Sequence, residues 1–177
     1  GVFMAEVEVD IKTGKTKVIK MTLHGDFGPI GSRLAVDGQM YGGIAQGIGL
    51  ALSEEFYDPK KHTTLIAQGF PYIMDIPDEI ELEYTETYRP SGPFGSSGCA
   101  ELPLTSPHVA ICNAIYQAAG VRIFELPALP DKILDGLQKL EKGEKIEPPE
   151  KYELGSEMEE VLETMKQNPI VMPLSLE

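Results

Sequence analysis

The chain has 177 residues, of which 42% are hydrophobic, and it carries a net charge of −13 with a pI near 4.6. This length suits one domain, or one domain with a tail, and the apolar content is enough for a core. The acidic balance excludes the basic footprint of a nucleic-acid-binding protein and argues against binding to an anionic membrane surface.

The use of cysteine indicates a reducing compartment inside the cell. Cys99 and Cys112 form no CxxC pair, so we expect neither a disulfide framework nor a zinc or iron–sulfur site on this chain. No apolar run reaches the length of a membrane span, and no signal-type leader precedes the first strand. We therefore expect a cytoplasmic protein. The chain begins at Gly1 rather than Met, which fits processing, trimming or a piece of something larger.

Two alternating segments open the chain. Residues 4–10 and 17–23 alternate apolar and charged side chains, and residues 12–15 between them contain a glycine. This pattern predicts an antiparallel hairpin with one face in solvent.

From residue 36 to residue 56 the pattern becomes helical. Apolar residues recur every four positions, which predicts a stripe facing the core. They are Met40, Ile44, Ile48 and Leu52. Another face carries glutamines and glycines: Gln39, Gly42, Gly43, Gln46, Gly47 and Gly49. Each glycine costs a helix about 1 kcal/mol relative to Ala. Either a second backbone packs very close to this face, or a ligand lies on it and uses the glutamine amides.

A loop of small residues spans positions 89–107. Three glycines recur there at every third residue, so the main chain can turn repeatedly and present N–H donors. They are Gly92, Gly95 and Gly98. Glu101 is the only charged side chain between Arg89 and His108. A lone carboxylate at the end of a donor-rich loop is a candidate general base, and the alternative is a solvated residue that favours the dipole of the next helix.

The remaining patterns complete an α+β fold, in which an antiparallel hairpin or mixed sheet packs with helices. Residues 80–88 alternate and predict a half-exposed strand that leads into the loop. A hydroxyl residue before Pro107 predicts the start of a helix that ends at Gly120. Residues 121–126 predict a short strand, and a third helix begins at Pro130.

We expect the domain to span residues 1–140 and an acidic tail to follow. Residues 141–177 hold four Lys and ten Glu, a net charge of −6. Two consecutive prolines at 148–149 prevent a continuous helix. Residues 157–167 predict a short amphipathic helix, so this tail would lie extended on its own surface or a partner's.

Two motifs of the chain match one known family. Residues 37–49, DGQMYGGIAQGIG, resemble the glycine-and-glutamine helix of the molybdenum hydroxylases, the family of xanthine oxidase/dehydrogenase and aldehyde oxidoreductase. Residues 92–103, GPFGSSGCAELP, resemble the family's late active-site loop, which ends in its catalytic glutamate. The opening hairpin matches as well, and the likeness continues to Leu140. Two motifs in the right order make the resemblance specific, and the whole is most similar to bacterial aldehyde oxidoreductases.

The resemblance implies roles for these residues. In the family a molybdenum–pterin cofactor lies between two large domains, and this chain resembles the C-terminal portion of such a molybdopterin-binding domain. Gln46 matches the pterin-contacting glutamine, and Glu101 matches the general base. The implied cofactor-binding residues are Gln39, Gly42, Gly43, Gln46, Gly47, Ser96, Ser97 and Gly98. No side chain is implied as a metal ligand. One departure is that Cys99 and Ala100 stand where the family usually has an aliphatic residue and glycine.

The implied reaction is the oxidation of an aldehyde or N-heterocycle with water as the oxygen source. The cofactor is molybdenum–molybdopterin, with the cytosine dinucleotide as one form, and 2Fe–2S clusters are expected on the missing part or a partner. Expected partners are the rest of the hydroxylase, a small substrate and a second copy of the full assembly, without nucleic acid or membrane. The chain would not be active alone. The alternative is a non-catalytic assembly or remnant module that provides only a packing surface.

Overall fold

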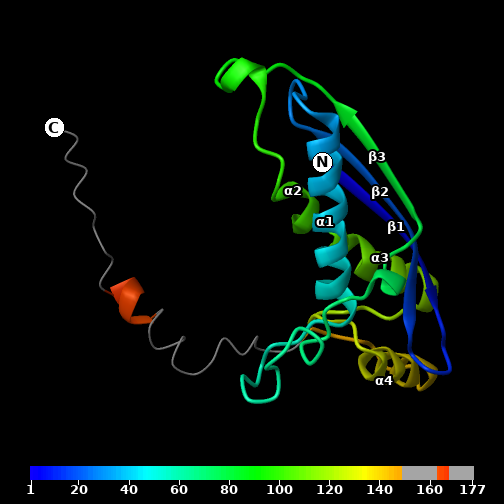
Figure 1. The fold of residues 1–177 in the computed structure, drawn as a ribbon. Coiled ribbons are helices and arrows are strands. Elements are labelled where there is room, and N and C mark those ends of the chain that lie inside the picture. Colours follow the sequence, from blue (N-terminus) through cyan, green and yellow to red (C-terminus); the bar gives the residue numbers. More distant parts are fainter. Residues whose placement is uncertain (149–162, 168–177) are drawn as a thin grey trace. The chain divides into compact units, whose positions relative to one another are not determined.

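A computed structural model describes residues 1–148 and 163–167, and its strands form one mixed sheet in the order β1–β2–β3 (Figure 1). β1 (Val2–Val9) and β2 (Thr16–Asp26) pair antiparallel, which confirms the predicted hairpin, and β3 (Glu79–Thr85) pairs with β2 in parallel. The carboxyl ends of β2 and β3 therefore meet at the same edge of the sheet.

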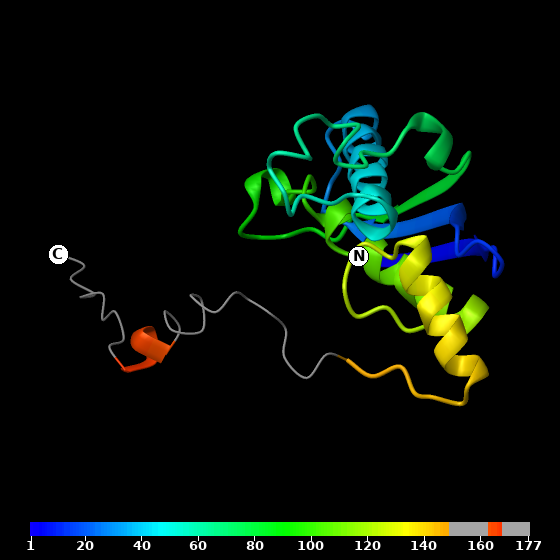
Figure 2. The same cartoon turned by 90° about the horizontal axis from the view of Figure 1, so that it is seen from below.

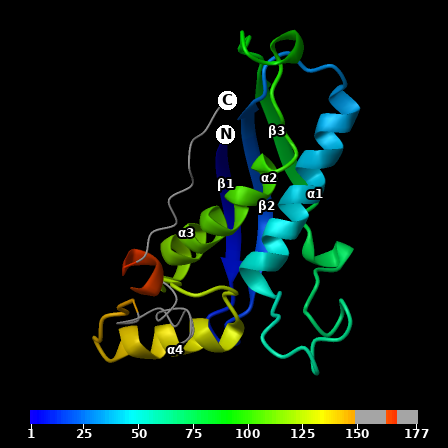
Figure 3. The same cartoon turned by 90° about the vertical axis from the view of Figure 1, so that its left-hand side faces the viewer.

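One face of the sheet is covered by α1 (Arg33–Leu52) and α3 (Pro107–Ala119), as Figures 1 and 3 show. The short helix α2 (Leu102–Thr105) leads into α3. Apolar residues of the sheet, α1 and α3 form the buried core between these layers. Its largest fully buried members include Met21, Leu23, Met40, Ile44, Ile48, Ile111 and Ile115. The four-residue apolar period of α1 is thus confirmed as its core face.

α4 (Pro130–Glu141) lies at the hairpin end of the sheet (Figure 2). Gly14 of the hairpin turn has a φ of +73° and lies directly against the carbonyl of Pro130, so a side chain could not fit there. Two 3₁₀ turns, η1 (Ile73–Asp75) and η2 (Pro93–Gly95), complete the first compact unit, which ends at residue 146.

Two predicted boundaries and one predicted strand need correction. α1 begins three residues before the predicted start and ends at Leu52, because Ser53 leaves the helical backbone conformation and caps the helix. β3 ends at Thr85, and the next residues bond to other segments instead of continuing the strand. Residues 121–126 form no strand. Val121 is buried against Gly136 of α4, so this segment packs on a helix without a strand partner.

The helices that follow the loop also begin differently from the sequence prediction. α3 begins at Pro107 as predicted, but the Ser106 side chain makes no capping hydrogen bond. α2 was not predicted from the sequence. Gly120 ends α3 with a φ of +73°, as expected.

Little of the predicted tail falls within the described part. Residues 163–167 are helical, in line with the predicted helix at 157–167, whose earlier residues lie outside the described part. The division at residue 140 and the extended tail remain predictions. Within residues 1–148 and 163–167, no helix has both the length and the apolar character needed to cross a bilayer.

A polar cluster fixes the start of α1 to β3. The Tyr84 hydroxyl donates to Asp37 Oδ1 at 2.7 Å, and Arg33 Nε donates to the same atom at 2.8 Å. The Arg33 guanidinium also lies 4.2 Å from the centre of the Tyr84 ring. The hydrogen bond from Tyr84, together with that from Arg33, lowers the pKa of Asp37, whereas burial and the nearby Asp37 carboxylate raise the pKa of Tyr84. The ionised form of Asp37 is thus favoured by the fold.

The lowered pKa of Asp37 predicts an acid-sensitive contribution to stability. Because the folded-state pKa lies below the unfolded value of 3.8, this contribution is present above that value and lost as pH falls through the folded pKa. We expect Asp37→Asn to flatten the fall in unfolding free energy below about pH 4, measured by urea denaturation at stepped pH. Asp78→Asn, at an exposed carboxylate, is the control. An unchanged slope in Asp37→Asn would contradict the assignment.

Candidate active site

The candidate site forms at the sheet edge where β2 and β3 end. Asp26 is the last residue of β2 and pairs in register with Thr85, the last residue of β3. The segments that leave these two strands, residues 27–32 and 86–101, therefore start side by side. Loops beyond the carboxyl ends of parallel strands are a common location for ligand sites in α/β sheets.

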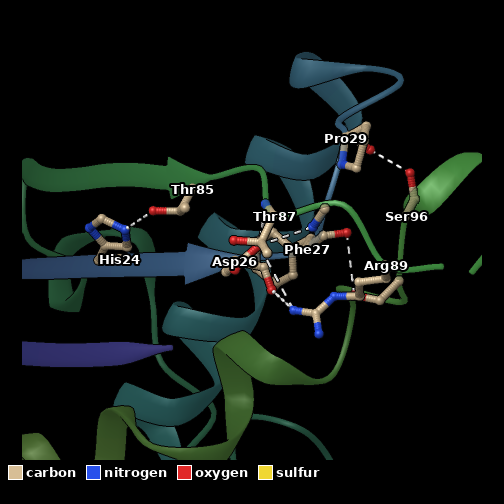
Figure 4. Close-up of polar contacts among 10 residues, drawn as sticks. His24, Asp26, Phe27, Pro29, Thr85, Thr87, Arg89 and Ser96 are labelled. Atoms are coloured by element: carbon tan, nitrogen blue, oxygen red, sulfur yellow. Dashed lines mark hydrogen bonds and ion pairs between the residues drawn. The ribbon is translucent and has the colours of Figure 1, made fainter. Parts of the chain in front are cut away.

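Asp26 ties the two departing segments together (Figure 4). Its carboxylate accepts hydrogen bonds from the backbone amides of Gly28 and Thr87, each at 3.1 Å. Its backbone carbonyl accepts one from the Arg89 guanidinium at 2.9 Å. The bonds from Thr87 and Gly28, with the Arg89 charge 3.8 Å away, lower the pKa of Asp26. The carboxylate therefore stays ionised and can hold both segments near neutral pH.

The serines of the loop complete this attachment. The Ser97 amide donates to the Phe27 carbonyl at 2.8 Å, and its hydroxyl contacts the same oxygen at 3.3 Å. The Ser96 hydroxyl donates to the Pro29 carbonyl (Figure 4). Both hydroxyls and the Ser97 amide are thus used to fix the loop. The sequence predicted main-chain contacts of these serines with a cofactor, and that prediction remains untested.

Glycine is required where these two segments touch. Gly28 has a φ of +70°, and a Cβ at this position would collide with the Gly95 carbonyl. Gly95 has a φ of +83°, and a Cβ there would collide with the Tyr88 ring. Glycine at position 28 therefore allows close packing between the two segments, and glycine at position 95 allows the loop to fold back against its own Tyr88.

A short free segment, residues 98–101, connects Ser97 to α2. The backbone amides of residues 98–101 donate no hydrogen bond within the described residues. A Cβ built at Gly98 would meet no atom within 4 Å. Glu101 is exposed, directly precedes α2, and its carboxylate has no hydrogen bond or ion pair within residues 1–148 and 163–167. Four backbone donors and one carboxylate are thus available to a ligand.

The glycines of α1 divide into two groups, and the first group serves helix packing. A Cβ at Gly43 would lie 2.5 Å from Cγ of Pro103, and one at Gly47 would lie 2.7 Å from Cβ of Pro107. Gly49 is likewise covered, by Glu54 and Pro71. Close packing thus accounts for these glycines, and the predicted cofactor contacts of Gly43 and Gly47 remain untested.

The second group lies on an open face of α1. A Cβ at Gly38 or Gly42 would meet no atom of the described residues within 4 Å. Gln39 and Gln46 are exposed on either side of Gly42. Close packing cannot account for a glycine with empty space around it. A bound ligand therefore remains the alternative explanation for the glycines on this face.

The contact between Gly43 and Pro103 brings the open face and the free segment to neighbouring positions. Pro103 lies two residues after Glu101, and Gly43 lies next to Gly42. Figure 1 shows α2 beside α1. The predicted residues of the helix and the predicted base therefore flank one contact. Of the predicted set, Ser96 and Ser97 also attach the loop to residues 27–29.

Sequence reasoning missed the residues that hold this arrangement. Pro103 and Pro107 are four residues apart, as are Gly43 and Gly47, and this equal spacing is a signal that could have revealed their pairing. Asp26 gave no such signal, because its partners are backbone groups. Within the described ranges, no group of three or more His, Cys, Asp or Glu could hold a metal ion.

Comparison with known proteins gives the class of this arrangement. Residues 1–77 match the molybdopterin cofactor-binding domain family. The predicted resemblance is confirmed: the chain is a relative of the molybdenum hydroxylases that include aldehyde oxidoreductase and the xanthine dehydrogenases.

Individual relatives are similar over most of the chain. The aldehyde oxidoreductase of Megalodesulfovibrio gigas is 61% identical over 138 residues, which cover 78% of this chain and 15% of the relative. The large subunit of nicotine 6-hydroxylase from Paenarthrobacter nicotinovorans is 35% identical over 72% of this chain and 16% of its own length. This chain thus spans less than a fifth of these relatives.

Solved structures share the fold. Aldehyde oxidoreductase from Desulfovibrio gigas superposes with a TM-score of 0.75 at 60% identity, over 77% of this chain and 15% of that one. Quinoline 2-oxidoreductase from Pseudomonas putida 86 gives 0.69 at 34% identity, over 75% of this chain and 18% of that one. The α+β class with a mixed sheet is therefore confirmed.

The two groups of glycines in α1 predict opposite effects of one substitution. Gly47→Ala places a methyl group against Pro107 and should lower the free energy of unfolding by about 1–3 kcal/mol. Gly42→Ala, in the same helix, adds a methyl group in open space and should raise it by up to about 1 kcal/mol. Thermal and urea unfolding of the two variants measure this difference. Equal effects of the two substitutions would refute the division into two groups.

Proposed function

We propose that this chain forms one wall of a molybdenum–pterin site in a hydroxylase that oxidises aldehydes or N-heterocycles with water as the oxygen source. The observation that carries the proposal is the exposed Glu101 carboxylate, which follows a segment of unbonded backbone donors and lies beside an open helix face. The relatives named aldehyde oxidoreductase and nicotine 6-hydroxylase support the reaction class.

The residues present fit a flat heterocyclic cofactor with oxygen-rich groups. The open space at Gly42 lets a ligand approach the helix backbone, which a side chain would prevent. The amides of Gln39 and Gln46 each offer a donor and an acceptor, the combination that a heterocycle edge requires. The unbonded amides of residues 98–101 are donors for anionic oxygens. Ser96 and Ser97 contribute by holding this segment in place.

Glu101 carries the proton transfer in this proposal. A bound molybdenum–pterin supplies the two-electron oxidation, which no side chain can perform. The Glu101 carboxylate accepts the proton of the water-derived oxygen that attacks the electrophilic carbon of the substrate. Its exposure and its lack of hydrogen-bond or ion-pair partners among residues 1–148 and 163–167 leave both carboxylate oxygens able to accept.

The rest of the protein supplies what this chain lacks. The chain spans about 15% of the aldehyde oxidoreductase of M. gigas, and its resemblance to the family's late active-site loop assigns it to the C-terminal portion of a molybdenum-binding subunit in this proposal. The second wall of the site, the substrate channel and the 2Fe–2S clusters belong to the remainder in this proposal. The proposal also includes the cytosine dinucleotide form of the cofactor, a homodimer of the full assembly and a cytoplasmic location. The unpaired Cys99 and Cys112 are compatible with that location.

Glu101→Gln tests the general base in the assembled enzyme. Loss of the base should lower kcat by about 10²–10⁴-fold, while molybdenum and pterin contents stay at the wild-type level. Glu125→Gln, at another exposed glutamate, is the matched control and should turn over normally. Normal aldehyde oxidation by Glu101→Gln would refute its role as base.

The open face of α1 is tested by cofactor content. Gly42→Leu fills the space, and Gln46→Ala removes an amide, so each should lower the pterin recovered per mole of assembled protein. Gln117→Ala, at an exposed glutamine of α3, should leave the pterin content unchanged. Wild-type protein without pterin would instead support the alternative of a non-catalytic assembly module.

A further inference from the structure

Glu101 belongs to a segment that is free between two fixed points. On one side, Ser97 is bonded to Phe27, and on the other, Pro103 is seated on Gly43. Residues 98–101 make no backbone hydrogen bond as donors within the described part of the chain. The position of the carboxylate is therefore set by the two fixed points and by the packing of Cys99 against the core, and not by hydrogen bonds or ion pairs of its own among the described residues.

The fixed point at Ser97 depends on Asp26. The carboxylate holds the amide of Gly28 and so supports the left-handed turn that lies against Gly95. It also holds the amide of Thr87, where the second segment leaves β3. The Asp26 side chain thus fixes the backbone of both segments, and the contact between these segments positions Ser96 and Ser97.

Arg89 also joins the two segments, through its backbone amide and its guanidinium. Its backbone amide donates to the Gly95 carbonyl at 2.9 Å, and its guanidinium donates to the Asp26 carbonyl at 2.9 Å. The guanidinium lies 3.8 Å from the Asp26 carboxylate (Figure 4). The residue therefore joins the loop that contains Gly95 to the end of β2.

We propose that Asp26 and Arg89 are a positioning pair that sets the placement of Glu101 without touching substrate or cofactor. This rests on the proposed role of Glu101 as base. In Asp26→Ala the two segments lose their shared acceptor, the attachment of Ser97 weakens, and residues 98–101 sample positions away from the productive one. A displacement of about 1 Å is enough to lower turnover by about 10²-fold.

The first measurement is hydrogen exchange on the full assembled protein, which needs no turnover. In Asp26→Ala, peptides that contain Thr87 and Ser97 should exchange about tenfold or more faster through local opening, while peptides of α1 keep their protection. Asp10→Ala is the matched control, because Asp10 also holds two backbone amides through its carboxylate but lies in the hairpin turn at the opposite end of β2. It should leave exchange at residues 87–97 unchanged.

The second measurement separates positioning from general destabilisation. Asp26→Ala should lower kcat more than it raises KM, and it should add no further loss in a Glu101→Gln background, because it acts through that carboxylate. Asp26→Asn keeps an oxygen for the two amides and should recover most of the protection and turnover. Arg89→Lys keeps the charge and one donor and should fall between wild type and Arg89→Ala.

The outcomes distinguish the two proposals. Faster exchange in Asp26→Ala with wild-type kcat would overturn the positioning role and leave the role of Glu101 intact. Additive losses in Asp26→Ala and Glu101→Gln would also overturn it. Should Glu101→Gln turn over normally, the proposed base would be refuted, while unchanged exchange at residues 87–97 in Asp26→Ala would refute the positioning pair by itself.

Discussion

The contact of two prolines with two glycines is the constraint on which the candidate site depends. Pro103 and Pro107 lie against Gly43 and Gly47 of α1, where any Cβ would collide. The equal spacing of the two pairs makes the helix and the proline-bearing segment fit in a single register. This register holds the start of α2, and with it Glu101, beside the open face of the helix. The loss of helix propensity at the glycines is offset by this close packing.

Two different physical causes thus produce one glycine-rich motif. Gly43 and Gly47 are explained by protein atoms already present, whereas the space at Gly42 is left empty by the described residues. Sequence reasoning kept packing and ligand binding as alternatives for the whole face, and the structure shows that packing holds for one group. A ligand on Gly42, Gln39 and Gln46 is therefore a separate question from the stability of the helix.

Those parts of the fold that depend on side-chain periodicity could be predicted from the sequence. The hairpin and the core face of α1 were found from spacing, because alternation and four-residue periods reflect which face is buried. The candidate base was found as a lone carboxylate in a small-residue loop. The network around Asp26 was missed, because it depends on backbone groups brought together by the parallel pairing of β2 and β3. The four-residue helix α2 was missed, because it is too short to leave a periodic pattern. The apolar run at 121–126 was misassigned because burial against a helix leaves the same pattern as a strand.

The unbonded amides of residues 98–101 have a consequence for how the site tolerates variation. A backbone donor is present whatever side chain the residue bears, except in proline. Cys99 and Ala100, which depart from the usual family pattern, therefore keep all the donors of this segment. The donors of this segment are therefore main-chain groups, and substitutions around Glu101 other than to proline leave all four of them in place.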